Sequence, residues 1–269
     1  MENINTYSKK ERNMFLTGMF GQNMIYNVVA VGLYYYFQNV ICLPAIALGW
    51  IFAIARIWDA INDPMMGSIV DKTRTKWGKC RPYLIIFPGI IGVVTILTFI
   101  NGNYANAKAN GNKTAMIFIV AWAAISYVLW GMSYTVGDIP LWGIISRITE
   151  SEKDRSSLIS LSRIIASIGA GLVVISIVAV SQSLNSAFGL DTNAQKGFIV
   201  AAIIITIIGS ALFECAGIGT KERVPNGSET KTMKESFALM WKCKPFRRIL
   251  ISGLLRAPLQ LMMNIAMTL

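Results

Sequence analysis

The chain has 269 residues, of which 54% are hydrophobic and only 14% are charged, and its mean hydropathy is +0.52. Soluble domains carry about 25% charged residues, so this composition excludes an ordinary soluble protein and favours a membrane protein. The formal net charge of +11 would by itself fit a nucleic-acid-binding protein. The distribution of the basic residues along the chain distinguishes a nucleic-acid-binding protein from a membrane protein.

Long apolar stretches follow one another along the chain. A helix that crosses the hydrocarbon core needs about 20 apolar residues. We predict six spans, at residues 15–37, 45–70, 82–100, 115–145, 158–180 and 198–218, and the start of a seventh from residue 249 to Leu269. No alternating strand pattern is present, so the fold class that we expect is an all-α membrane protein.

The basic residues gather in alternate loops. Nineteen Lys and Arg residues lie before the first span, between the second and third, between the fourth and fifth, and at residues 221–248, whereas the other loops hold three. This asymmetry is the positive-inside pattern, which predicts a cytoplasmic N-terminus in a cell membrane. The charge is then a signal of topology, so the expected partner is the lipid bilayer and not nucleic acid.

A polar segment divides the predicted spans. We predict a six-helix bundle at residues 1–219, a cytoplasmic linker at 220–248 and the incomplete start of a second bundle at 249–269. Six helices, a long linker and a new helix match the N-terminal half of a carrier built from two six-helix halves.

The 45–70 span contains three ionisable residues. Arg56, Asp59 and Asp63 are spaced i, i+3 and i+7 and share one helix face. Five ionisable residues inside the predicted spans, these three with Asp138 and Arg163, would cost on the order of 15 kcal/mol to insert unless they pair, so pairing of Arg56 is expected. Two carboxylates one turn apart favour a site for Na⁺ or for a shared proton. The alternative is a structural salt bridge.

The 115–145 span contains a second polar stripe. Tyr134, Asp138 and Trp142 recur at i, i+4 and i+8. An indole covers the apolar face of a sugar ring while a carboxylate accepts hydrogen bonds from its hydroxyls, so the stripe favours sugar binding. Anchoring at the membrane interface is the alternative for Trp142. We expect Arg163 to pair with Asp138, to bind a substrate hydroxyl, or to extend its charged end to the membrane surface. For Asn23 the alternatives are contact with the substrate and a hydrogen bond between helices.

Two longer motifs resemble the glycoside-pentoside-hexuronide:cation symporters. The first is RIWDAINDPMMG at residues 56–67, which continues through DKTR at 71–74 to WGKCRPY at 77–83. The second runs from LWGMSY at 129–134 to DIPLW at 138–142 and is similar to the melibiose permease group. The resemblance implies a major-facilitator fold, alternating access and uptake of a sugar coupled to Na⁺ or H⁺, with no cofactor beyond that ion.

The resemblance also implies roles for single residues. It gives a cation site formed by Asp59, Asp63 and Thr135, which would be the metal ligands if the ion is Na⁺. The implied sugar-binding residues are Tyr134, Asp138, Trp142 and Arg163, and the implied residues of the gating loop are Gly67, Asp71 and Arg74.

One departure from the melibiose permease pattern affects the expected substrate. That group carries Lys and Asp where this chain has Gln22 and Asn23, so a hexuronide or a pentoside stays open beside a galactoside. The second half of such carriers also supplies a lysine to the site, so we do not expect transport by residues 1–269 alone.

Other functions have less support. The sequence has no His, no GxSxG motif, no zinc-ligand spacing and no P-loop, so we do not expect an enzyme. A lipid-carrying relative of the same fold is the main alternative, and a non-transporting fragment is the other.

Overall fold

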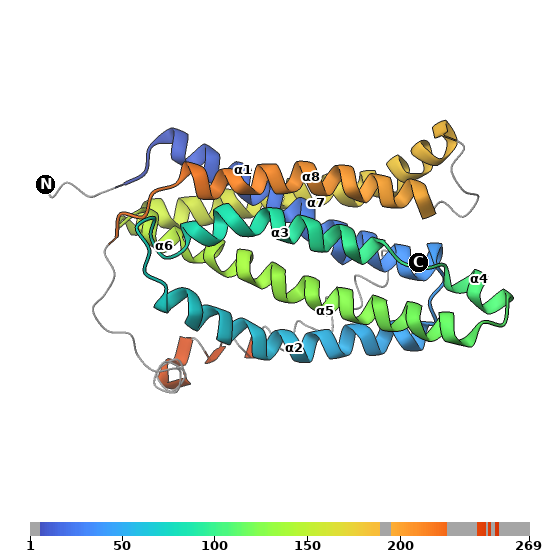
Figure 1. The fold of residues 1–269 in the computed structure, drawn as a ribbon. Helices are drawn as coiled ribbons and strands as arrows, with labels where there is room; N and C mark the ends of the chain where they lie inside the picture. Colours follow the sequence, from blue (N-terminus) through green and yellow to red (C-terminus); the bar gives the residue numbers. More distant parts are fainter. Residues whose placement is uncertain (1–5, 189–194, 225–240, 246, 249–250, 253–269) are drawn as a thin grey trace, which may run out of the picture. The chain divides into compact units, whose positions relative to one another are not determined.

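A computed structural model describes residues 6–188, 195–224, 241–245, 247–248 and 251–252. The chain divides into two compact units, Met1–Pro225 and Asn226–Leu269. The first unit is a bundle of helices, and its described residues contain no β-strand, so the predicted all-α fold is confirmed (Figure 1). The second unit contributes short helical pieces between residues 241 and 252.

The helices of the first unit follow the predicted spans in chain order. They are α1 (Lys9–Asn27), which continues into the π-helical segments η1 (Val28–Leu33) and η2 (Tyr36–Val40), then α2 (Ala45–Lys72), α3 (Arg81–Phe99), α4 (Tyr104–Ala109), α5 (Lys113–Gly143), α6 (Ile145–Ile148), α7 (Glu152–Phe188) and α8 (Gln195–Gly219).

Membrane-length helices account for most of the first unit. Within the described residues, five helical stretches are long and apolar enough to cross a membrane: Ala45–Lys72, Arg81–Ala109, Lys113–Ile148, Glu152–Ala187 and Gln195–Gly219. The predicted span at 15–37 lies on α1, η1 and the start of η2. α1 is more polar than those five stretches, because it has a charged first turn and carries four amide side chains. The predicted span at 249–269 lies outside the described residues, apart from 251 and 252.

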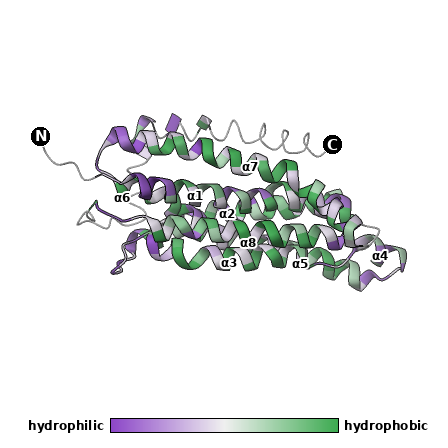
Figure 2. Ribbon diagram, turned by 90° about the horizontal axis from the view of Figure 1, so that it is seen from above, coloured by the Kyte–Doolittle hydropathy of each residue, from purple (hydrophilic) through white to green (hydrophobic). Residues whose placement is uncertain are grey.

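Polar residues cap the N-terminal ends of α1 and α5. Ser8 and Glu11 form a reciprocal capping box at the start of α1, and Asn112 accepts a hydrogen bond from the third residue of α5. Figure 2 shows apolar residues along the helices and strongly hydrophilic residues where α1 begins and α6 lies. We call this the basic end of the bundle; it comprises residues 6–12, 72–81, 147–155 and 221–224.

Small residues set how closely the helices pack. α1 lies against α7 and α8, α3 lies against α8 and α5, and α2 packs on α5. At the α1–α8 crossing, a β-carbon added to Gly21 would lie 2.5 Å from the carbonyl oxygen of Gly209. At the α3–α8 crossing, one added to Gly217 would lie 2.7 Å from the backbone carbon of Leu84. Glycine at these positions lets the backbones approach as closely as they do.

The segment after α8 ties the basic end together. The Glu222 carboxylate accepts hydrogen bonds from the backbone N–H groups of Lys79 (3.0 Å), Cys80 (2.7 Å) and Arg81 (3.1 Å). It therefore caps the N-terminus of α3, where the helix dipole favours an anion.

The neighbouring residue makes the second tie. Arg223 forms an ion pair with Glu11 of α1, with a closest N–O distance of 2.8 Å. Burial raises the pKa of Glu11, but hydrogen bonds from Ser8 and Arg223 outweigh it, so the pKa lies below its usual value. Segment 220–224 thus joins the ends of α1, α3 and α8.

Candidate functional site

Two aspartates of α2 lie against one turn of α5. The Thr135 hydroxyl donates to Asp63 Oδ1 at 3.0 Å and also lies 3.0 Å from the Gly131 carbonyl oxygen. One turn earlier, Asp59 approaches Gly131 so closely that an added β-carbon would lie 3.2 Å from Asp59 Oδ1. The i, i+4 pair of α2 therefore faces an i, i+4 pair of α5, and carboxylate, hydroxyl and carbonyl oxygens gather between the helices.

The positive charge beside these carboxylates is limited. Arg56 Nη1 lies 3.6 Å from Asp59 Oδ2, and the two side chains are 64% and 29% exposed. An ion pair of this length and exposure is weak. Asp63 forms no ion pair with any residue that the structure describes. Hard oxygen ligands with one unbalanced carboxylate suit a monovalent cation such as Na⁺, or a proton.

A second group of polar side chains connects α1 and α5. The buried Gln22 amide donates to Asp138 Oδ1 at 2.7 Å and also to the Tyr134 hydroxyl. Asn23 Nδ2 donates to Gln22 Oε1 at 2.5 Å, which orients the Gln22 amide. Tyr134 and Asp138 lie one turn apart on α5, and the distance from the hydroxyl to Asp138 Oδ1 is 3.5 Å. The predicted stripe on α5 is thus held in place by α1.

The remaining predicted substrate residues lie beside Asp138. The Arg163 guanidinium of α7 lies over the Trp142 ring, 4.8 Å from its centroid. Trp142, Arg163 and Asp63 are all electrostatic or hydrogen-bonding neighbours of the Asp138 carboxylate. The predicted substrate residues from α1, α5 and α7 therefore converge on one carboxylate. Since Asp63 is also a neighbour of that carboxylate, this group adjoins the aspartates of α2.

An aromatic column extends the site along α5. Tyr127 stacks on Trp130 with ring centroids 6.0 Å apart, and Trp130 stacks on Tyr134 at 4.9 Å. Tyr26 of α1 packs against Tyr134 at 5.4 Å. Trp130 Nε1 donates to Thr95 Oγ1 of α3, which fixes the ring that supports Tyr134. This column gives Tyr134 a rigid backing.

Gln22 and Tyr26 were not identified from the sequence as residues of the site. Gln22 stood out only as a departure from a family pattern, and its sequence spacing could not show that its amide reaches Asp138 across two helices. Tyr26 follows Gln22 at i+4, so a helical wheel of α1 could have placed it on the same face. The predicted gating residues lie apart from this group: Gly67 and Asp71 occupy the last turns of α2, and Arg74 lies in the loop that follows.

Known proteins match the chain over most of its length. The family described as MFS/sugar transport protein matches residues 14–269. The isoprimeverose transporter of Lactiplantibacillus pentosus is 28% identical over 239 residues, which are 88% of this chain and 46% of the relative. The inner membrane symporter YicJ of Escherichia coli is 29% identical over 248 residues, which are 92% of this chain and 50% of the relative.

A lactose permease of Leuconostoc lactis is 29% identical over 190 residues, which are 69% of this chain and 29% of the relative. The chain thus spans about half the length of the first two relatives and less than a third of the lactose permease. All three are transporters and not enzymes, in agreement with the prediction from the sequence. With five membrane-length helices and a family match over residues 14–269, the chain belongs to the MFS/sugar transport protein family of multi-pass membrane proteins.

Proposed function

We propose that the protein takes up a sugar together with a cation, Na⁺ or H⁺, by alternating access. One observation carries the proposal. Thr135 donates a hydrogen bond to Asp63. The residue before it, Tyr134, accepts a hydrogen bond from the Gln22 amide, which also donates to Asp138. A cation group and a sugar group thus share adjacent residues of α5. The relatives named for isoprimeverose and lactose transport support a sugar as the substrate.

The cation binds among the oxygens of Asp59, Asp63 and Thr135. Asp63 is the main ligand, because Arg56 forms its ion pair with Asp59 and, among the described residues, forms none with Asp63. Binding neutralises the excess negative charge of the pair, which otherwise raises the cost of keeping two carboxylates in a membrane. Thr135 contributes its hydroxyl oxygen and orients Asp63 through the contact seen here.

The sugar binds beside Asp138. The Trp142 ring covers an apolar face of the sugar, and the Arg163 guanidinium on that ring donates to hydroxyl groups. Gln22 holds Asp138 and Tyr134 through one amide, so a sugar hydroxyl that reaches Asp138 replaces the Gln22 contact. Asn23 supports Gln22 and presents a second amide to the substrate. This neutral amide pair is the part of the site that selects among hexuronides, pentosides and galactosides.

Coupling follows from the shared helix. A cation that fixes Thr135 also fixes the next residue, Tyr134, and with it the Gln22–Asp138 network. By linkage, the sugar then tightens cation binding by the same factor. Binding of each ligand organises the site of the other.

The whole carrier needs parts beyond the described bundle. We place residues 1–219 as the N-terminal bundle, 220–248 as a cytoplasmic linker and 249–269 as the start of a second bundle, with the N-terminus in the cytoplasm of a cell whose plasma membrane holds the protein. Gly67, Asp71 and Arg74 act at the cytoplasmic gate. Reading the coding sequence on both sides of residues 1–269 comes first, since uptake is to be measured on the protein that it encodes.

Uptake of radiolabelled sugars into cells that express that coding sequence tests the proposal. Wild-type cells should accumulate one of the sugar classes, with a stimulation by Na⁺ or by low external pH that names the ion. Asp63→Cys should abolish the stimulation. The matched control is Glu214→Gln, which also removes one carboxylate but lies on α8, beside Gly89 of α3. An Asp63→Cys variant that keeps full ion stimulation would overturn the proposal, as would uptake of lipid and of no sugar.

A further inference from the structure

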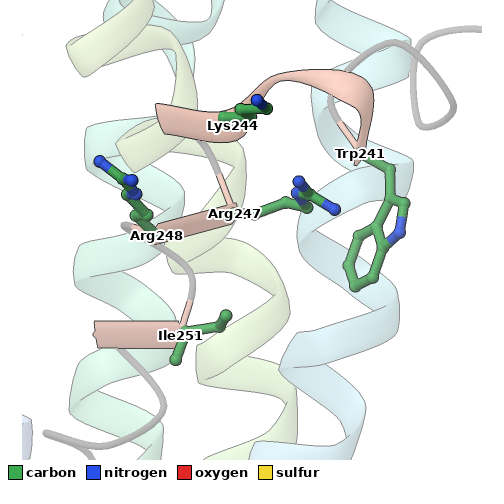
Figure 3. Close-up of a pocket in the computed structure, with 5 residues that line it drawn as sticks. All are labelled: Trp241, Lys244, Arg247, Arg248 and Ile251. Atoms are coloured by element: carbon green, nitrogen blue, oxygen red, sulfur yellow. The ribbon is translucent and has the colours of Figure 1, made fainter.

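A basic and aromatic recess lies in the second unit. Lys244, Arg247 and Arg248 line it together with Trp241 and Ile251, and its volume is about 450 Å³. Figure 3 shows Arg247 extending toward the side of Trp241, while Arg248 extends toward the opposite side. All five residues are exposed within the described structure. The recess thus combines three cationic groups with an indole ring and an aliphatic side chain.

The local sequence provides no acidic partner for these cations. Lys242 adds a further positive charge beside Trp241, and no Asp or Glu occurs from residue 236 to residue 269. Segments with a cluster of Lys and Arg beside a membrane span attract anionic lipid headgroups. Arginine also binds phosphate oxygens in a bidentate manner, which lysine does not. The charge of the recess therefore favours a phosphate group as its ligand.

The position in the chain indicates where that phosphate comes from. The basic residues of the recess directly precede the apolar residues 249–269, which include Ile251, in a chain that belongs to a family of membrane proteins. Trp is enriched at the interface between headgroups and acyl chains, because its ring is apolar and its N–H is polar. A recess with Trp241 and Ile251 beside three cations matches the two chemical parts of a lipid, the phosphate and the first acyl carbons.

We propose that Trp241, Lys244, Arg247, Arg248 and Ile251 form a binding site for the phosphate headgroup of an anionic phospholipid. The site fastens the five residues that form it to the membrane surface and makes their position depend on lipid composition. This goes beyond the general basic asymmetry of the loops, which requires charge but no preference for one lipid. Each basic residue of the recess contributes about a fivefold change in affinity for anionic membrane.

A fluorophore placed next to the recess tests the proposal. Cys243 is exposed and lies between Lys242 and Lys244, whereas Cys80 is buried. With Cys42 and Cys215 replaced by Ser, an environment-sensitive dye on Cys243 of the 269-residue chain reports on this segment. The labelled chain is compared in nanodiscs of phosphatidylcholine alone and of equal parts phosphatidylcholine and phosphatidylglycerol. Phosphatidylglycerol should shift the emission to shorter wavelength, and added NaCl should reverse the shift because salt screens exposed charges.

The triple variant K244Q/R247Q/R248Q should lose the shift in phosphatidylglycerol. The matched control K108Q/K113Q/K196Q removes the same formal charge from residues outside the recess and should keep the shift. Inorganic phosphate in excess, at constant ionic strength, should leave the shift in place.

Three results would overturn the proposal. They are equal spectra in the two lipids, loss of the shift in both triple variants, and displacement by inorganic phosphate, which would assign the recess to a soluble phosphate compound. None of these results depends on sugar uptake, so the lipid site and the transport proposal can fail separately.

Discussion

The α1–α8 crossing makes a sharp prediction about stability. A β-carbon on Gly21 would lie 2.5 Å from the Gly209 carbonyl oxygen and 2.6 Å from the backbone nitrogen of Phe213. Ordinary contacts begin near 3.4 Å, so α1 and α8 must separate by roughly 1 Å in Gly21→Ala. Backbone atoms cannot rotate away as a flexible side chain can, and overpacking of this kind costs about 1–3 kcal/mol.

Gly171 provides the matched control. It also lies inside a long helix, α7, but a β-carbon there would meet no atom within 4 Å. Alanine favours a helix over glycine by about 1 kcal/mol at both positions, so this effect cancels in the comparison. The free energy of unfolding of Gly21→Ala should therefore be about 1–3 kcal/mol below that of Gly171→Ala.

Thermal unfolding of the purified variants in one neutral detergent measures the difference. At 2–4 °C for each kcal/mol, the Tm of Gly21→Ala should lie about 2–12 °C below that of Gly171→Ala. Intrinsic tryptophan fluorescence suits the measurement, because neither change removes a tryptophan. Equal melting temperatures would refute the close approach of α1 and α8.

Three further predictions concern the site and the basic end. Thr135→Val keeps the shape of the side chain but removes the hydroxyl, so the cation concentration for half-maximal uptake should rise about tenfold or more, whereas Thr135→Ser should stay near wild type. Gly131→Ala crowds Asp59 alone, at 3.2 Å, so it should weaken the response of uptake to the cation without lowering the Tm. Glu11→Gln should lower the Tm at neutral pH, because the carboxylate pairs with Arg223. Since the pKa of Glu11 lies below its ordinary value of 4.5, this stabilisation is present above that value and is lost as the pH falls below it, so the melting curves of wild type and variant should converge in acid.

Sequence patterns predicted the fold class and the family well, for physical reasons. Apolar stretches of membrane length have few alternatives to helix, and the motif around Asp59 and Asp63 is long. Helix geometry by itself also puts Tyr134, Asp138 and Trp142 on one face, because each lies about one turn after the last. These features depend on residues close together in the chain.

Contacts between residues that are far apart in the chain could not be predicted from the sequence. Gln22 reaches Asp138 across 116 positions, and a helical wheel gives the face of each helix but not which two faces meet. The π-helical segments after Asn27 were not predicted either, because they contain no proline and a single glycine, Gly32, does not mark a change of helical register. Tertiary packing decides both features.

The cap on α3 has a consequence for how the protein is made. Glu222 lies 142 positions after Cys80, yet its carboxylate satisfies the backbone N–H groups at the start of α3. A ribosome therefore completes α3 long before the residue that caps it exists. Until Glu222 has been synthesised, those donors must bind water or another partner. Closure of this end is accordingly a late event in biogenesis, set by the synthesis of the segment that follows α8.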